Sequence, residues 1–204
     1  MRYDVKHKEE SRDRILSAAG RSFRASGTES VRVSDVMQSV GMTHGGFYKH
    51  FANKEQLIHE AIETALTEVS SALTKLTQGM SRNEALRAVI NFYLSEDHML
   101  HPDLGCALAA LGTEMARMAP ETKAAVSKAL DAYADRLSYL MPGKTRVQQQ
   151  AAFLVLFPSM AGCIMTARAH ADRECQLQIL TGGRAFFAQA FCSQSATEYL
   201  EVLQ

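Results

Sequence analysis

Apolar residues recur at intervals of three and four in a stretch that a glycine interrupts once. The members of this stretch are Val33, Val36, Met37 and Val40. Residues three and four apart share one helix face, so the interval predicts a short helix with one buried side. We expect Gly41 to end this helix in a left-handed conformation, with Met42 tucked under the turn.

A second short helix is expected directly after this turn. The hydroxyl of Thr43 can cap its first turn, and Phe47 and Phe51 form its inward face. Its outer face would then carry His44, Gly45, Gly46, Tyr48, Lys49 and His50. Two glycines near a helix start cost about 1 kcal/mol each, which makes sense if the backbone must approach another molecule closely. The pattern therefore predicts a helix-turn-helix that reads the major groove of DNA.

This motif resembles that of the tetracycline-repressor (TetR) family of bacterial transcription regulators. The resemblance rests on residues 41–51, on the following Asn53-Lys54-Glu55-Gln56-Leu57, and on an upstream stripe of Ile15, Leu16, Ala19 and Phe23 that Gly27 closes. It covers about residues 10–60. It implies an all-α protein with an N-terminal helix-turn-helix DNA-binding domain at residues 1–56 and a C-terminal helical ligand-sensing and dimerisation domain at residues 57–204.

The resemblance also implies which residues meet DNA. The implied set is Ser34, Thr43, His44, Gly45, Gly46, Tyr48, Lys49, His50 and Lys54. Within it, Lys54 would meet a phosphate at the start of the next helix. Two positions depart from the family pattern: Arg32 stands where a hydroxyl N-cap is usual, and His44 replaces the frequent Lys or Pro.

The charge distribution separates the two ends of the chain. Residues 1–56 hold 10 Lys or Arg against 7 Asp or Glu, and the remainder holds 12 against 15, so a net of +3 is balanced by a net of −3. An N-terminal arm could lie along phosphates with its basic residues Arg2, Lys6, His7, Lys8, Arg12 and Arg14. The alternative is a solvated, frayed terminus.

Helical patterns continue beyond the motif. Asn53 with Gln56 and Ser81 with Glu84 have the spacing of capping boxes, each opening an amphipathic helix. A polar run from Ser95 leads into an expected loop at Pro102. Further helices are expected over residues 105–119, 121–141, 145–169 and 172–191, separated by proline and glycine.

The last two helices are expected to form a dimer contact. Small residues would allow close helix approach, namely Ala151, Ala152, Ser159, Ala161, Gly162, Ala167 and Ala169, and the final helix adds Leu177, Leu180, Phe187 and Phe191. Two such helices from each subunit would build a four-helix interface, as the family resemblance implies. The alternative is that both helices only cover the core of one protomer.

A ligand cavity is expected among the middle helices. Its candidate lining is Phe92, Tyr93, Met115, Tyr133, Phe153 and Phe157, with Met118 and Met160. The alternative is that these residues are ordinary core. The sequence has no strongly basic pocket, so an apolar or weakly polar small molecule is the expected inducer.

Cys106 is a second ligand candidate. It follows Gly105 at the start of an expected helix, where free N–H groups favour a thiolate and so raise reactivity towards oxidants and electrophiles. Some family members that resemble the chain around Gly105-Cys106-Ala107-Leu108 respond through a cysteine there. The alternative is a buried small hydrophobe.

Other chemistry is less well supported. Asp97, His98, His101 and Cys106 match no established zinc spacing, so neither a metal nor another cofactor is expected. No nucleophile stands beside a recognisable base, which argues against an enzyme. A structural adaptor would leave the exposed face at Tyr48 unexplained.

Composition favours a location inside the cell, and the family resemblance implies a bacterial one. With 204 residues, 47% of them apolar, the chain can bury a full core. We expect a cytoplasmic protein without membrane association, since no run approaches transmembrane length and the charged N-terminus lacks an apolar region behind it. Its four scattered cysteines fit reduced thiols. The expectation is a homodimeric repressor that binds a palindromic operator and is released by an apolar, electrophilic or oxidant inducer.

Overall fold

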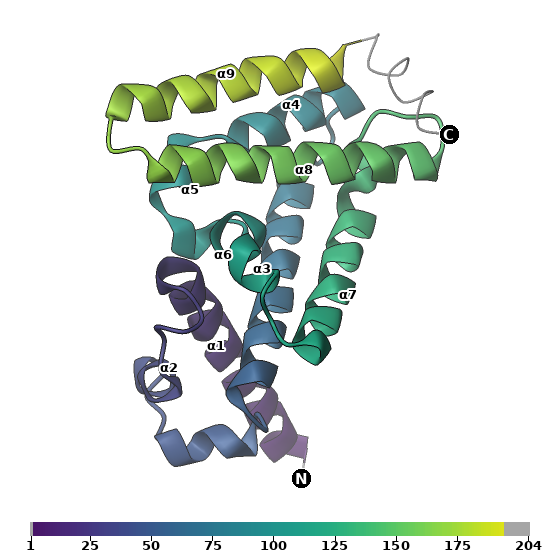
Figure 1. Ribbon diagram of the computed structural model, residues 1–204. Helices are drawn as coiled ribbons and strands as arrows, with labels where there is room; N and C mark the ends of the chain where they lie inside the picture. The colour runs from purple at the N-terminus through teal and green to yellow at the C-terminus, as the bar shows by residue number, and fades with distance from the viewer. Residues whose placement is uncertain (1, 194–204) are drawn as a thin grey trace. The chain divides into compact units, whose positions relative to one another are not determined.

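The computed structural model describes the backbone of residues 2–193 and the side chains of residues 6–193. All regular structure in this part is helical, which confirms the all-α prediction (Figure 1). The elements are α1 (Arg2–Ser26), α2 (Val33–Ser39), η1 (His44–Lys49), α3 (Lys54–Leu76), α4 (Arg82–Tyr93), α5 (Glu96–Leu100), η2 (Pro102–Leu104), α6 (Ala107–Met115), α7 (Pro120–Leu137), η3 (Ser138–Leu140), α8 (Arg146–Ala169) and α9 (Arg173–Cys192), where η marks a 3₁₀-helix.

The helices pack as two compact units. One comprises Met1–Thr67 with Pro102–Leu130, and the other comprises Glu68–His101 with Asp131–Gln204. The boundary falls within α3 and α7, so α6 packs with the N-terminal helices. This division by packing differs from the predicted division by role between residues 56 and 57, which remains a prediction.

The first unit is built on α1 and the first half of α3. The apolar stripe predicted on α1, from Ile15 to Phe23, is buried, as are Leu57, Ala61 and Ile62 on α3. A Cβ at Gly20 would lie only 3.3 Å from the carbonyl oxygen of Ala61. These two helices therefore pack closely, and their shared core supports the shorter elements between them.

The N-terminal basic residues belong to a helix, and their contact with phosphates stays a prediction. α1 begins at Arg2 and includes every one of them. No glycine or proline occurs before Gly20, and Lys6 forms an ion pair with Glu10 one turn later, at 3.8 Å. Both features favour a continuous helix over an extended or frayed terminus.

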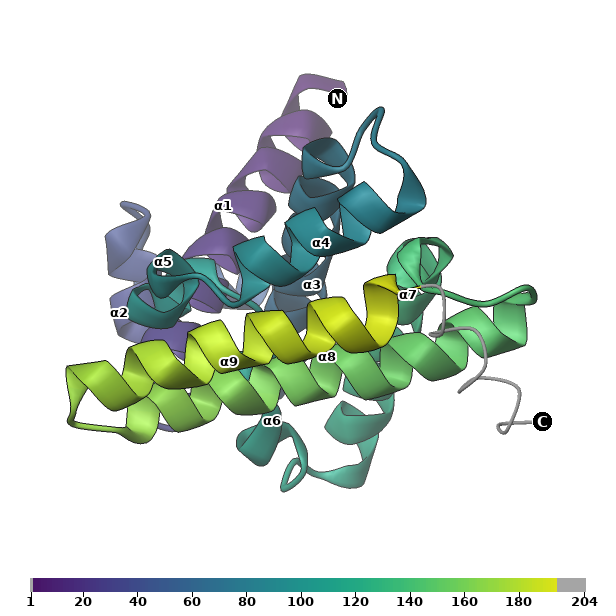
Figure 2. The ribbon, with the colours of Figure 1, turned by 90° about the horizontal axis from the view of Figure 1, so that it is seen from above.

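The second unit contains α8 and α9, which lie side by side, with α4 alongside α9 (Figure 2). The predicted capping box opens α4: Ser81 accepts a hydrogen bond from the backbone of Glu84, whose side chain accepts one from the backbone of Ser81. Thr145 and Gln148 form the same arrangement at the start of α8. These caps fix where both helices begin.

The region between α4 and α6 is more ordered than the sequence predicts. The polar run from Ser95 contains α5, which Ser95 caps by accepting from the backbone N–H of His98 at 3.1 Å, and the expected loop at Pro102 forms the 3₁₀ turn η2. A five-residue helix is too short to produce a helical period in the sequence. The predicted helix at residues 105–119 is shorter, and the one at 121–141 ends at Leu137 before the turn η3.

Among the described residues, α8 is the one helix long and apolar enough to cross a membrane by length and composition. The sequence expectation that no segment approaches this length is therefore wrong. Its Leu156, Met160 and Ile164 are fully buried inside the protein. Core helices of soluble proteins have the same composition, so α8 is only weak evidence for a membrane span.

Candidate functional site

The turn between α2 and η1 has the predicted glycine conformation. Gly41 has a φ of +73°, in the left-handed region. Its N–H donates to the carbonyl of Gln38 at 3.0 Å, and the N–H of Met42 donates to the carbonyl of Met37 at 2.9 Å. This pair of bonds is a Schellman motif, which satisfies the last carbonyls of α2 and turns the chain sharply.

The second element is a 3₁₀-helix rather than an α-helix. The adjacent Gly45 and Gly46 weaken any α-helical preference, which accounts for this difference. The predicted hydroxyl cap is wrong: Thr43 occupies the N-cap, but its side chain accepts no bond. Its backbone carbonyl instead accepts from the N–H of Gly46 at 3.0 Å.

Two buried phenylalanine side chains hold η1 against the core. Phe47 and Phe51 are both buried, and their rings stack with centroids 5.5 Å apart. The side chain between them in sequence, Tyr48, is 66% exposed. Burial of the two rings therefore fixes the orientation of η1 and leaves its other face, with Tyr48, open to solvent.

The exposed face contains most of the residues predicted to meet DNA. Thr43, His44, Gly45, Tyr48 and Lys49 are exposed, and Gly46 and His50 are half-buried. The His44 and Tyr48 rings meet edge to face, with centroids 6.1 Å apart. Among the described residues nothing lies within 4 Å of a Cβ built at Gly45. The fold itself therefore does not require this glycine, and its bare backbone is accessible to another molecule.

Two further predicted residues flank this face. Ser34 is exposed at the start of α2, where its hydroxyl donates to the carboxylate of Asp35 at 3.1 Å. Lys54 is the first residue of α3, and its ammonium group lies 3.5 Å from the carbonyl oxygen of Glu29. The cap of α3 is Asn53, which accepts from the N–H of Gln56 at 2.8 Å, as predicted.

Positive charge from α1 reaches η1. Burial lowers the pKa of His50, and the positive charges of Lys8, Arg12 and Lys49 lower that pKa further. The Nδ1 atom of His50 is buried and has no hydrogen-bond partner among the described residues. Positive charge near His50 favours an anionic partner such as a phosphate.

The sequence did not indicate that two arginines of α1 support this surface through hydrogen bonds to α2 and α3. Arg14 donates to the carbonyl oxygen of Val40 at 2.7 Å, at the end of α2. Arg12 donates to Glu60 on α3 at 2.7 Å. Both arginines had been assigned to an arm on DNA. Their partners lie 26 and 48 residues away in sequence, so no local pattern could indicate them.

The comparisons with known proteins agree with this geometry. Residues 15–61 match the family described as bacterial regulatory proteins, tetR family. Over 138 residues the chain is 30% identical to an uncharacterized HTH-type transcriptional regulator, YfiR, from Bacillus subtilis (strain 168). The region at residues 15–61 is of the TetR family. The alignment with YfiR covers 66% of this chain and 65% of that protein, so the chain spans just under two thirds of the relative's length.

Solved structures share the fold of this chain. The reduced form of NemR from E. coli superposes with a TM-score of 0.71 at 17% identity, covering 89% of this chain and 97% of that one. A putative transcriptional regulator from Saccharomonospora viridis, solved in complex with choline, gives 0.67 at 16% identity and covers 90% and 98%. At these identities the likeness concerns the fold alone.

Four aromatic rings predicted to line a ligand cavity meet in the second unit of the chain. Phe153 and Phe157 stack at 4.3 Å between centroids, and Tyr133 meets both edge to face at 5.6 Å. Tyr93 meets Phe157 at 5.8 Å. All four are buried.

Phe92 does not belong to this cluster, so its assignment to a cavity lining is wrong. Its side chain is 49% exposed. The inner face of α4 is set by Val89, Ile90 and Tyr93, all buried. One residue along an α-helix is a rotation of about 100°, so the position before Tyr93 turns to solvent.

Cys106 and Met115 are buried in the first unit, on α6. Cys106 is the N-cap of α6, as the sequence predicts, and it is 2% exposed. Its thiol is not in a disulfide, and neither are those of Cys163, Cys175 and Cys192. A sulfur in this position benefits from the helix N-terminus, but a reagent must first gain access to it.

An open groove is present in the second unit, away from the aromatic cluster. It has a volume of about 630 Å³ and lies between the end of α3, the start of α4 and η3. Lys75, Arg82, Met80 and Tyr139 are among its lining residues. None of them was predicted to bind a ligand.

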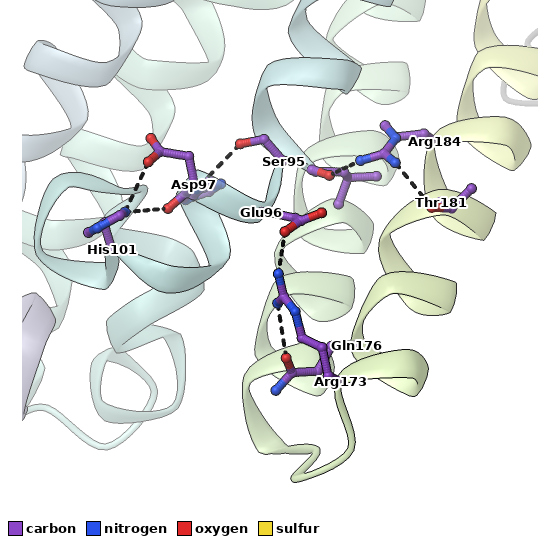
Figure 3. Close-up of polar contacts among 10 residues, drawn as sticks. Ser95, Glu96, Asp97, His101, Arg173, Gln176, Thr181 and Arg184 are labelled. Atoms are coloured by element: carbon purple, nitrogen blue, oxygen red, sulfur yellow. Dashed lines mark hydrogen bonds and ion pairs between the residues drawn. The ribbon is translucent and has the colours of Figure 1, made fainter.

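The residues considered for a metal are engaged with one another or with backbone. His101 and Asp97 form an ion pair at 3.0 Å (Figure 3). The Nδ1 atom of His98 lies 2.6 Å from the carbonyl oxygen of Tyr93. Among the described residues no three His, Cys, Asp or Glu side chains are grouped so that they could hold a metal ion.

α8 and α9 present an outward apolar face, and of the small residues predicted for a dimer contact Ser159 and Ala169 are exposed on α8. Leu154 on α8 and Phe186 on α9 are 64% and 65% exposed, and Val147, Val155 and Met165 are exposed as well. The small residues Ala152, Ala161 and Ala167 are instead buried within the protomer, as are Leu180 and Phe187. Buried and exposed positions lie close together in the sequence of α8, and the sequence pattern alone did not show which residues face the core.

Proposed function

We propose that this chain is a homodimeric repressor that binds a palindromic operator through η1 and the adjacent basic surface. The observation that carries the proposal is the exposure of Tyr48 and Lys49 on an element whose other side, Phe47 and Phe51, is locked into the core. A rigid support under an exposed polar and aromatic face is what base reading requires. The DNA contacts would come from the nine predicted residues, Ser34, Thr43, His44, Gly45, Gly46, Tyr48, Lys49, His50 and Lys54.

The homodimer is supported by the outward face of α8 and α9. Leu154, Phe186 and their exposed apolar neighbours form a stripe that a second copy would cover. Pairing two copies about a twofold axis places two copies of the η1 surface side by side. Each can then bind one half-site, and the half-sites lie about 34 Å apart along the duplex. This arrangement requires operator symmetry.

The inducer is proposed to be a small, largely apolar molecule. The aromatic cluster of Tyr93, Tyr133, Phe153 and Phe157 supports this class, because a ligand that replaces ring contacts needs apolar surface with one or two polar handles. A neighbour of the same fold was solved with choline. Inducer binding would shift the conformational equilibrium of the dimer towards a form in which the spacing of its two η1 surfaces no longer matches that of the operator half-sites. Release from DNA would follow.

A thiol route through Cys106 is the alternative form of induction. A quinone would accept the Cys106 sulfur at a ring carbon. The thiol proton would end on one quinone oxygen, and the hydrogen on the attacked carbon would move to the other oxygen, which gives a hydroquinone thioether. Cys106 is the N-cap of α6, so such an addition would take place at the start of this helix. Adding a ring at a fully buried position would displace α6.

Selection of DNA from a random duplex pool tests the proposed function. The purified chain is incubated with the pool at moderate salt, and the bound duplexes are amplified and sequenced over several rounds. We expect an inverted repeat to be enriched, with half-site centres about 10 base pairs, or a multiple of this, apart. A pool that stays random with the wild type, and looks the same with Tyr48→Ala, would contradict sequence-specific binding.

A further inference from the structure

Glu114, near the end of α6, binds the turn that links α1 to α2. One carboxylate oxygen accepts from the backbone N–H of Thr28 at 2.8 Å and from the hydroxyl of Thr28 at 2.6 Å. Thr28 is buried. Its two donors therefore depend on this one oxygen, which comes from a residue 86 positions away.

The position of Glu114 is unfavourable for α6 itself. It lies in the last turn of the helix, where the carbonyl ends make a negative charge destabilising. Leu111 and Met115 already bury the inner face of α6, so the carboxylate is not needed for packing. An acidic residue in this place is explained by the bonds that it makes to Thr28.

The backbone of the turn is shaped to receive this carboxylate. Gly27 ends α1 with a φ of +81°, and its N–H donates to the carbonyl of Phe23 at 2.8 Å. A Cβ at Gly27 would lie 2.8 Å from the second oxygen of Glu114. Only glycine combines this φ with this close approach.

A second contact holds the segment before α6 to the end of α1. The guanidinium of the buried Arg24 donates through Nε to the carbonyl oxygen of Asp103 at 2.8 Å, and through Nη2 to the same oxygen. Asp103 lies in η2, three residues before Cys106. α6 is therefore tied at both ends to the last turn of α1 and the turn that follows it.

We infer that Glu114 is a positioning residue for DNA binding. Through its bonds to Thr28 it fixes the direction in which the chain enters α2. Because Glu114 belongs to α6, the orientation of the DNA-binding surface on η1 then depends on the position of α6. The inference rests on the proposed function, since it concerns the surface that meets DNA. Displacement of α6 breaks the two bonds to Thr28 and leaves its buried donors unsatisfied. The turn before α2 then relaxes, and η1 loses its operator-competent orientation.

Variants at three positions test the inference. Glu114→Ala removes both bonds, Glu114→Gln keeps an acceptor oxygen of the same reach, and Thr28→Val removes only the hydroxyl bond. Thr113→Ala, at the exposed position next to Glu114, is the matched control. Two quantities are measured: affinity for a duplex selected by the wild type, and hydrogen exchange at the Thr28 amide by NMR.

We expect Glu114→Ala to lose about tenfold or more in affinity for the selected duplex and to speed Thr28 exchange, while far-UV circular dichroism and oligomeric state stay unchanged. Glu114→Gln and Thr113→Ala should remain close to the wild type, with Thr28→Val between them and Glu114→Ala. If Glu114→Ala is unfolded, Thr28→Val alone decides the matter by the same two readouts. Wild-type affinity with faster Thr28 exchange would overturn the inference, and so would unchanged exchange. If the wild type selects no duplex, the proposed function fails instead, and the exchange data still report whether the contact exists.

Discussion

The guanidinium carbon of Arg12 lies 4.6 Å from the centre of the Phe51 ring. This cation–π contact connects α1 to the residue that closes the reading element, and Arg12 is held in place by Glu60. A side chain that the sequence assigned to DNA therefore also supports the element that carries the reading face.

Replacing the exposed aromatic residue should separate recognition from folding. We expect Tyr48→Ala to weaken binding to a selected duplex by about 10- to 100-fold, because a residue at the base-reading face contributes roughly 1–3 kcal/mol to discrimination. Its midpoint of thermal unfolding should stay within about 2 °C of the wild type, since the ring is largely in solvent. Fluorescence anisotropy and calorimetry measure the two quantities. Loss of folding would instead make Tyr48 part of the core.

Lys54 is expected to meet a phosphate and no base. Lys54→Ala should weaken binding to selected and scrambled duplexes alike, and reduce the slope of log affinity against log salt by about one unit. Lys128→Ala, at an exposed position on α7, is the control and should leave the slope unchanged. A variant slope equal to that of the wild type would remove Lys54 from the interface.

The stability of the protein should fall in mild acid. Burial lowers the pKa of His98, and the hydrogen bond to the carbonyl of Tyr93 only partly opposes this. The folded state therefore favours the neutral ring, so the stability it contributes is present above the unfolded pKa of about 6.5 and is lost as pH falls through the lower folded value. His98→Gln should reduce the difference in unfolding free energy between pH 7.5 and 5.5.

His50 contributes to the same pH dependence with the same sign, because its pKa is also lowered. The double variant His50→Gln with His98→Gln should therefore show a smaller difference than either single variant. Urea unfolding at the two pH values provides the measurement. A pH difference that survives in the double variant would assign the effect to other groups.

The outward face of α8 and α9 should govern association. Leu154→Arg places a charge at the centre of the proposed contact, and we expect the dimer dissociation constant to rise by about 100-fold or more. Phe92→Arg, on the exposed side of α4, is a control with a similar change of exposed apolar surface. Sedimentation equilibrium should show monomers for the first variant and dimers for the second.

Cys106 should be required for release from DNA only if the inducer reacts covalently with the protein. In the covalent case a quinone releases the wild type from its duplex, and Cys106→Ser remains bound at the same quinone concentration. Cys175→Ser is the control, since Cys175 is a half-buried thiol on α9. Equal release of wild type and Cys106→Ser would leave the aromatic cluster as the proposed inducer site.

Local patterns predicted the parts of the fold that local forces determine. The spacing of Phe47 and Phe51, the left-handed Gly41 and the capping box at Ser81 all depend on residues within a few positions, and each has the expected structure. The cap at Thr43 was wrong because a backbone carbonyl competes with the hydroxyl for the same donors.

Contacts between distant segments could not be predicted in this way. Glu114 meets Thr28 across 86 residues, and nothing near either residue marks it as a partner. Phe92 and Tyr93 are adjacent aromatic residues with opposite exposure, which depends on the packing of α4. The five-residue α5 was missed because its cap and its buried histidine need the rest of the second unit to be stable.

Equilibrium binding to DNA tests the central claim most directly. A duplex enriched by the wild type and a scrambled duplex of the same composition are titrated by fluorescence anisotropy over a salt series. We predict a preference of about 1,000-fold or more for the enriched duplex, affinity that falls steeply with salt for both, and loss of the preference in Tyr48→Ala. Equal affinity for the two duplexes at every salt concentration would contradict sequence-specific regulation by this chain.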